Sequence, residues 1–253
     1  MKFIYAWYYK HGKINEKQAL FESFHGKDVS DSSLAILQEF LKMPESKDFK
    51  IYFATNDKKR DQKFIDSIGL KVELVDIADF KYVKVLATSK YLINNSSFPA
   101  YFIRRDEQVY LQTWHGTPLK KLVLDMEDVF MVNETDIESY QKGFVKNVQS
   151  WDYLISQNPF STTTFRRAFD FNKCMLEIGY PRNDILFKKN NEEDIVRLKR
   201  RLGLPLDKKI LLYAPTFRDD EFNENSSYKF SPKLSFQKLK EALQEEYILI
   251  VKY

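Results

Sequence analysis

The feature that most constrains this chain is the alternation of short apolar runs with segments of helical periodicity along its length. The apolar runs predict strands at Lys2–Tyr9, Lys50–Ala54, Lys71–Val75, Tyr91–Asn94, Gln108–Thr113, Tyr153–Ser156, Met175–Ile178, Lys209–Tyr213 and Tyr247–Val251. The periodic segments predict helices at Ser33–Lys42, Lys58–Ile68, Phe80–Ser89, Ser139–Val148, Ser161–Ala168, Glu193–Leu202 and Ser235–Glu245. Because strands separated by helices favour βαβ units, we expect an α/β fold with a parallel sheet.

A purely polar run, KKNNEE, near Lys188–Glu192 indicates a domain boundary. We therefore divide the chain into a domain of residues 1–190 and a second one of residues 191–253. The second segment contains only two expected strands, with one expected helix before them and one between them, which bury too little apolar surface for independent stability. We expect this second domain to be incomplete in the chain.

The composition excludes several classes of protein. The chain is 43% hydrophobic and 30% charged, which supports a buried core, and its net charge of +4 is too small to indicate a nucleic-acid binder. A single cysteine, Cys174, and three histidines argue against a disulfide framework and a His/Cys zinc site. Neither a Gly-rich phosphate loop nor an apolar run of membrane-spanning length is present, so we expect a cytoplasmic protein or one held on the cytoplasmic side of a membrane.

The segment QTWHGTPLKKL follows a predicted strand, where open α/β sheets bind their ligands. His115 in this segment has a side chain that can take a proton at neutral pH. Gly116 permits close backbone approach to a ligand, and the Thr117 hydroxyl can donate to a phosphate. An ordinary strand-to-helix turn with Pro118 near the start of the helix explains the same residues equally well.

Three further segments carry residues suited to anions or hydroxyl groups. In GYPRND, Arg182 offers a planar fork for phosphate, and Asp184 either orients it or begins the next helix. In LLYAPTFRDD, Thr216 and Arg218 are candidates for an anion site. Residues 21–31, FESFHGKDVSD, place polar groups between aromatic ones, as an acceptor-binding loop or a helix cap would. Taken one at a time, each segment is explained more simply as a turn or a capping loop.

Taken together and in this order, the four segments resemble the CDP-glycerol glycerophosphotransferase family, the teichoic acid primases and polymerases. The matching pieces are FESFHGKDVSDSSLAI, YLINNSSFPAYFIRRDEQVYLQTWHGTPLKKL, GYPRNDIL and LLYAPTFRDD. The resemblance implies a GT-B-like architecture. Residues 1–190 would form a Rossmann-like, acceptor-side domain, and residues 191–253 would begin a second Rossmann-like domain that holds the nucleotide donor.

The resemblance also implies an activity. Family members move glycerol phosphate or a related polyol phosphate from CDP-glycerol or CDP-ribitol to a hydroxyl of a teichoic-acid or capsule-type polymer or its lipid-linked primer, and release CMP. It implies no metal, cofactor or nucleic acid, and a peripheral position on the cytoplasmic side of the cell membrane. The roles that it implies are a general base at His115, contacts to the donor phosphates at Gly116, Thr117, Pro118, Arg182, Thr216 and Arg218, and support from Trp114 and Asp184.

The sequence departs from the family pattern at its end. The family continues with a Lys-x-His-Pro-like motif and a Thr-Asp-Tyr-Ser-Ser-like phosphate loop, whereas residues 247–253 supply only the strand and Lys252. We therefore expect this polypeptide by itself to be a weak or inactive transferase. The alternative is a catalytically inactive GT-B-like fragment that binds an anionic polymer, a lipid-linked acceptor or a partner enzyme.

Overall fold

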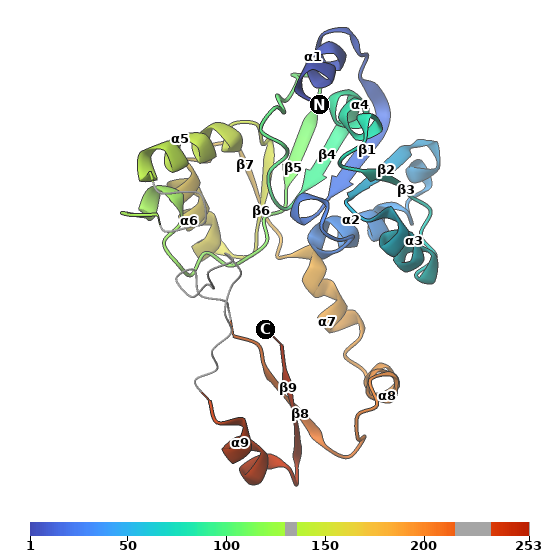
Figure 1. Cartoon of the computed structure of the whole chain (residues 1–253), viewed down its shortest axis with the longest axis vertical. Coiled ribbons are helices and arrows are strands. Elements are labelled where there is room, and N and C mark those ends of the chain that lie inside the picture. Colours follow the sequence, from blue (N-terminus) through green and yellow to red (C-terminus); the bar gives the residue numbers. More distant parts are fainter. Residues whose placement is uncertain (130–135, 216–233, 253) are drawn as a thin grey trace. The chain divides into compact units, whose positions relative to one another are not determined.

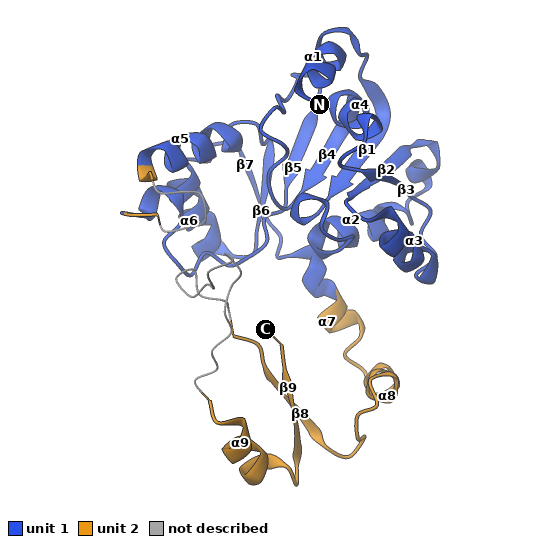
Figure 2. Cartoon of the chain, in the orientation of Figure 1, with its two compact units in different colours: residues 1–127, 138–184 blue, residues 128–137, 185–253 orange. Residues whose placement is uncertain are grey.

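The computed structural model describes residues 1–129, 136–215 and 234–252 (Figure 1). The chain divides into two compact units, one of residues 1–127 and 138–184 and the other of residues 128–137 and 185–253 (Figure 2). The change between the units falls at residues 184 and 185. The assignment of residues 1–190 and 191–253 to two functional domains stays a prediction.

The first unit is built on a seven-stranded sheet in which every neighbouring pair is parallel. Its strands are β1 (Asn15–Glu22), β2 (Lys50–Thr55), β3 (Glu73–Asp76), β4 (Ser89–Asn94), β5 (Val109–Gln112), β6 (Tyr153–Ser156) and β7 (Cys174–Glu177). Their order is β3-β2-β1-β4-β5-β6-β7, so the winding reverses between β1 and β4. Loops that leave the carboxyl ends of strands beside such a reversal form the usual ligand site of an open α/β sheet.

Helices cover both faces of this sheet (Figure 1). They are α1 (Lys2–His11), α2 (Asp31–Phe40), α3 (Lys58–Ser67), α4 (Phe80–Thr88), α5 (Ile137–Val148) and α6 (Pro159–Phe169), with short 3-10 turns η1 (Phe24–Gly26), η2 (Pro44–Asp48), η3 (Val123–Asp125) and η4 (Pro181–Asn183). Successive β1 side chains point to opposite faces. Leu20 accordingly joins the core beneath α1, α4 and α6, whereas Phe21 joins the core beneath α2 and α3.

The structure corrects the expectation for the first residues. Lys2–Tyr9 was predicted as a strand because its aromatic and β-branched residues favour strands, but the segment forms helix α1. Ile4, Tyr5 and Tyr8 recur at helical spacing and pack on the core, with Tyr5 only 2% exposed. The central strand β1 was missed altogether, because its polar first half hides the buried residues that follow. With these two changes, the predicted α/β fold with a parallel sheet is confirmed.

The second unit contains α7 (Asp184–Lys188, of which only Asp184 belongs to the first unit), α8 (Glu192–Arg201), β8 (Lys209–Tyr213), α9 (Phe236–Leu243) and β9 (Tyr247–Val251). Strands β8 and β9 pair in parallel, as consecutive strands joined through a helix do. Among the described residues of the whole chain, no helix is long and apolar enough to cross a membrane.

Candidate active site

Strained loops mark the carboxyl edge of the seven-stranded sheet. Left-handed backbone conformations occur at Phe24 and His25 in the turn after β1, at Asp31 at the start of α2, and at Trp114 in the loop after β5. Such a conformation costs about 1–3 kcal/mol for a residue with a side chain and persists only where surrounding contacts enforce it. The concentration of strain at this edge, beside the reversal of the winding, makes it the candidate site.

His115 lies three residues beyond β5 and is exposed. Its Nδ1 is 2.7 Å from the backbone oxygen of Asn95, the residue that follows β4. Since a carbonyl oxygen only accepts hydrogen bonds, this contact requires a proton on Nδ1. In the neutral ring, Nε2 therefore carries the lone pair and can act as a base.

Asn95 connects the His115 loop to the strained turn after β1. While its backbone oxygen holds the His115 ring, its side-chain Oδ1 accepts a hydrogen bond of 2.8 Å from the backbone N–H of Phe24. The Asn95 side chain is fully buried. The loops that follow β1, β4 and β5 are thus joined by one residue.

Trp114 supplies the apolar support behind His115. Its indole ring stacks on the imidazole with 4.3 Å between ring centroids and 27° between planes. Its other contacts are with a cluster of aromatic rings, among them Phe144 and Phe169. The left-handed backbone at Trp114 is held by a hydrogen bond of 2.9 Å from its N–H to the side chain of Gln112. The imidazole consequently rests on a rigid platform.

The loop after His115 is open on one side and held on the other. A Cβ atom at Gly116 would meet no protein atom within 4 Å, so a ligand has room to approach the backbone there. On the held side, the Tyr180 hydroxyl donates to the Gly116 carbonyl at 2.6 Å. Burial raises the pKa of Tyr180 to about 12, so this hydroxyl keeps its proton at neutral pH. Thr117 is exposed and Pro118 is buried.

Arg182 reaches the same loop from the turn after β7. Its Nη1 donates to the His115 carbonyl at 2.9 Å and to the Asp31 carboxylate at 2.8 Å. The guanidinium also lies over the Tyr180 ring, 4.6 Å from the centroid, in a cation–π contact. The structure therefore brings Arg182 to His115, on the backbone of its loop.

Comparison with known proteins identifies the origin of this arrangement. The profile of the family described as CDP-Glycerol:Poly(glycerophosphate) glycerophosphotransferase matches residues 4–253. The chain belongs to this family. It is 42% identical to the teichoic acid poly(glycerol phosphate) polymerase of Bacillus subtilis over 94% of its length, and 39% identical to the teichoic acid glycerol-phosphate transferase of Staphylococcus aureus, also over 94%. The resemblance inferred from the four motifs is thus confirmed.

Solved structures of the family have the same fold. The wall teichoic acid polymerase TagF superposes with a TM-score of 0.88 and 34% sequence identity, covering 99% of this chain and 60% of that one. A variant of TagF soaked with CDPG superposes equally well, with a TM-score of 0.87. The chain spans 31% of the Bacillus subtilis relative and 60% of the Staphylococcus aureus relative, so it corresponds to part of these glycerophosphotransferases.

The glycerophosphotransferase site residues expected from sequence have different outcomes in the structure. His115, Gly116 and Arg182 lie together, with Trp114 behind the imidazole. Asp184 is the first residue of α7, which agrees with the alternative that it begins the next helix. Thr216 and Arg218 lie outside the described residues. The roles assigned to all these residues stay predictions.

Three residues of the site were not found by sequence reasoning. Asn95, Tyr180 and Asp31 hold the His115 loop through its ring, its Gly116 carbonyl and Arg182, respectively. Asn95 and Tyr180 each follow a strand closely and lie within the motifs YLINNSS and GYPRND, but neither motif by itself singles them out as supports of His115. Nothing in the sequence indicates that Asp31, at the start of α2, meets a residue so distant in the chain.

A buried acid lies at the same edge of the sheet. Glu22, the last residue of β1, is 1% exposed and accepts a hydrogen bond of 2.7 Å from the Tyr82 hydroxyl. Burial raises the pKa of Glu22 from 4.5 to about 7. Its carboxyl group is closed off from solvent, so it influences the stability of the edge rather than contacting a ligand.

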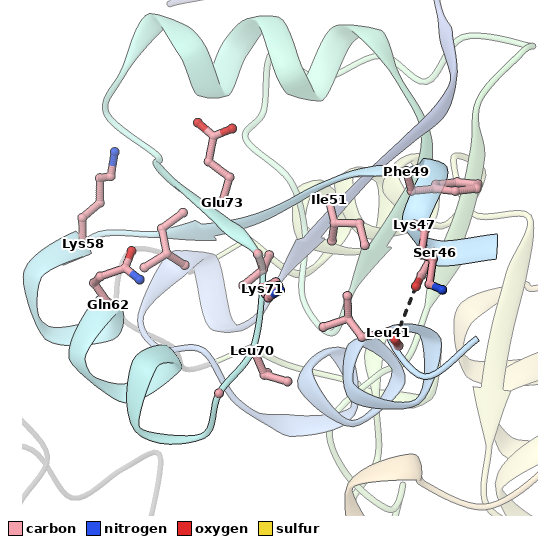
Figure 3. Close-up of a pocket in the computed structure, with 13 residues that line it drawn as sticks. Leu41, Ser46, Lys47, Phe49, Ile51, Lys58, Gln62, Leu70, Lys71 and Glu73 are labelled. Carbon is pink, nitrogen blue, oxygen red and sulfur yellow. Dashed lines mark hydrogen bonds between the residues drawn. The ribbon is translucent and has the colours of Figure 1, made fainter. Parts of the chain in front are cut away.

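A separate hollow lies at the opposite, amino edge of the sheet (Figure 3). The end of α2, helix α3 from its first residue Lys58, and the first residues of β2 and β3 surround a volume of about 890 Å³. Apolar side chains such as Leu41, Ile51 and Leu70 line it, and three lysines, Lys47, Lys58 and Lys71, lie around it.

Within residues 1–129, 136–215 and 234–252, no cluster of acidic, histidine or cysteine side chains is arranged to hold a metal ion.

Proposed function

We propose that this chain is part of an enzyme that transfers glycerol phosphate, or a related polyol phosphate, from a CDP-alcohol to a hydroxyl group of a teichoic-acid or capsule-type polymer or its lipid-linked primer. Membership of the glycerophosphotransferase family supports the proposal. So do the names of the relatives, which include glycerol-phosphate and ribitol-phosphate polymerases, and the CDPG soaked into TagF. CDP-glycerol is the first donor to test and CDP-ribitol the second.

The observation that carries the proposal is the orientation of His115. Its Nδ1 proton is held by the Asn95 carbonyl, which leaves the Nε2 lone pair on an exposed ring. In the proposed step, Nε2 takes the proton of the acceptor hydroxyl while the acceptor oxygen bonds to the phosphorus that carries the polyol. The bond from that phosphorus to the bridging oxygen breaks, and CMP leaves with the electron pair.

The donor phosphates would lie against the open side of the loop. Gly116 leaves room for them, and the exposed Thr117 hydroxyl can donate to their oxygens, with Pro118 fixing the backbone. The positive charge of Arg182 lies behind this loop and favours a dianionic donor. Thr216 and Arg218, which lie outside the described residues, are proposed to contact the donor as well.

The test is CMP release from CDP-glycerol and from CDP-ribitol by the purified chain, with calorimetry of donor binding in parallel. Release with one donor and its loss in His115→Gln would support the proposed reaction. Donor binding without release would favour a binding role that needs further protein for turnover. Neither binding nor release with either donor would remove the transferase assignment from this polypeptide.

A peripheral membrane position is proposed from helix α1. Phe3 is 89% exposed and Trp7 is 58% exposed, and they lie one helical turn apart with Lys2 and Lys10 at the ends of the helix. Aromatic side chains flanked by lysines suit the interface of an anionic membrane. Co-sedimentation with anionic vesicles that falls in the Phe3→Ser/Trp7→Ser variant is the expected result, and unchanged binding would contradict this role of α1.

One observation favours the second candidate, a non-catalytic binder of an anionic polymer. In the described part of the chain, Lys47, Lys58 and Lys71 around the hollow of Figure 3 make no ion pair, so their charges are available to a polyanion. Binding of polyphosphate that is weakened by Lys→Gln changes at these three positions, in a chain that releases no CMP, would support this candidate. Retained binding in the triple variant would contradict it.

A further inference from the structure

Asp31 is an acid in an unusual position. It is the first residue of α2 and has a left-handed backbone with φ of +61°. Its side chain is only 8% exposed. One carboxylate oxygen accepts the backbone N–H of Ser32 at 2.6 Å, and the other accepts Arg182 Nη1 at 2.8 Å. An aspartate is thus kept in a strained conformation with both oxygens occupied.

The partner of Asp31 is itself attached to the candidate base. The Arg182 nitrogen that Asp31 holds also donates to the backbone oxygen of His115 at 2.9 Å. The guanidinium is fixed from a second side by the Tyr180 ring at 4.6 Å. Because an ion-paired and stacked guanidinium has little freedom to turn, the position of the His115 carbonyl depends on where Asp31 holds Arg182.

We infer that Asp31 is a positioning residue for His115 and that Arg182 acts first as a clamp on the His115 loop. The inference rests on the proposed function, in which His115 is the base. Asp31 acts through Arg182, and Arg182 acts on backbone. Two anchors then define the imidazole: the Asn95 carbonyl fixes its ring nitrogen, and the Asp31–Arg182 pair fixes its main chain.

Loss of the Asp31 charge has a definite consequence in this arrangement. An asparagine side chain of the same shape holds a guanidinium less firmly than a carboxylate does, so the His115 carbonyl gains freedom. The Nδ1 hydrogen bond to the Asn95 carbonyl then weakens, and Nε2 moves away from the position in which it would accept the proton of the acceptor hydroxyl. A displacement of about 1 Å in a reacting group lowers turnover by up to roughly 10²-fold.

The kinetic test compares Asp31→Asn, Arg182→Lys and the double variant of the full chain with the unchanged protein. We expect kcat for CMP release to fall about 10- to 10²-fold in each single variant while KM for CDP-glycerol changes little. The double variant should be no worse than the poorer single one, because both changes break one clamp. Asp48→Asn, which breaks an exposed ion pair with Lys17, is the matched control and should leave kcat unchanged.

The opposite pattern would overturn the inference. If Arg182 serves the donor directly, Arg182→Lys raises KM with little change in kcat, and Asp31→Asn has no effect of its own. Unchanged kcat in Asp31→Asn, or additive losses in the double variant, would also show that the pair does not act on His115.

A second readout does not require turnover. The chain has three histidines, His11, His25 and His115, so nitrogen NMR of their rings can be assigned with one substitution for each. We expect the neutral His115 ring to carry its proton on Nδ1 alone, and Asp31→Asn to produce a mixture of the two tautomers. An unchanged His115 spectrum in Asp31→Asn would contradict the clamp. If the unchanged chain neither binds a CDP-alcohol nor releases CMP, the transferase assignment of this polypeptide fails, whereas the spectra still decide the role of Asp31.

Discussion

The two edges of the seven-stranded sheet differ in how their side chains are held. At the carboxyl edge, the loop of His115 is attached to Asn95 after β4 and to Tyr180 and Arg182 in the turn after β7. At the amino edge, Lys47 and Lys71 beside the hollow have no ion-pair partner among the described residues (Figure 3). A site that must place reacting atoms needs such attachments, whereas a surface that attracts a flexible polyanion does not. Each of the following changes tests this contrast.

The largest expected effect is that of His115→Ala on turnover. Removal of a general base lowers the rate by roughly 10²- to 10⁴-fold, and His115 is exposed, so the fold should be unaffected. Steady-state CMP release, measured in an active preparation, gives the ratio. His11→Ala, an exposed histidine of α1, is the control. Equal rates for the two variants would mean that the carboxyl edge does not carry the reaction.

The next effect is on stability, and it depends on pH. The pKa of Glu22 is about 7 in the folded chain against 4.5 as its ordinary value. Between these values the folded state binds more protons than the unfolded state, so stability falls as pH rises, by about 3 kcal/mol in total. Denaturant unfolding at pH 5, 6 and 7 should show this slope.

Substitution of Glu22 isolates its contribution to the pH dependence of the free energy of unfolding. We expect Glu22→Gln to flatten the dependence between pH 5 and 7 and to be the more stable protein at pH 7. Glu45→Gln, in the exposed turn after α2, should leave the slope as it is. A slope that survives in Glu22→Gln would assign the pH dependence to other groups.

A smaller loss is expected from Tyr180→Phe. The substitution removes the hydroxyl that donates to the Gly116 carbonyl and leaves the buried ring in place. One hydrogen bond contributes about 1 kcal/mol to stability, so the free energy of unfolding should fall by that amount and turnover should fall with the looser loop. Normal turnover in a destabilised variant would show that this hydrogen bond supports the fold alone.

The smallest effect on catalysis is expected at the amino edge. Replacement of Lys47 and Lys71 by glutamine should leave stability within about 0.5 kcal/mol, as is usual for exposed substitutions. Turnover with a short acceptor should stay within about twofold, because these residues lie at the other end of the strands. A loss comparable to that of His115→Ala would remove the distinction between the two edges.

The fold was predictable wherever the hydrophobic period of the sequence matches the pattern of burial of the element that forms. Tyr153–Ser156 and Lys209–Tyr213 form strands with the expected bounds, because short apolar runs between turns have few alternatives. The prediction of a strand at Lys2–Tyr9 was wrong because aromatic residues favour strands in general, whereas here Tyr5 and Tyr8 cover the sheet from a helix. Strand β1 was not predicted because its first residues, Asn15 and Glu16, are polar and typical of a loop.

The site was only partly predictable. The His115 loop was found because its motif is continuous in sequence and resembles a family signature. Its supports could not be found in the same way, because Asp31 and Arg182 carry no local pattern that pairs them. Contacts between distant residues depend on the completed sheet, which a reading of one segment at a time does not contain.

The span of the Asp31–Arg182 contact has a consequence for the biogenesis of the protein. The two residues are 151 positions apart, and Tyr180 lies beside the second of them. During synthesis, His115 leaves the ribosome well before its two supports from the turn after β7 do. Contacts of such long range form late in folding because a large loop must close first. The His115 loop is therefore assembled after most of the sheet is in place, and a growing chain that has not yet reached residue 182 carries the base without its clamp.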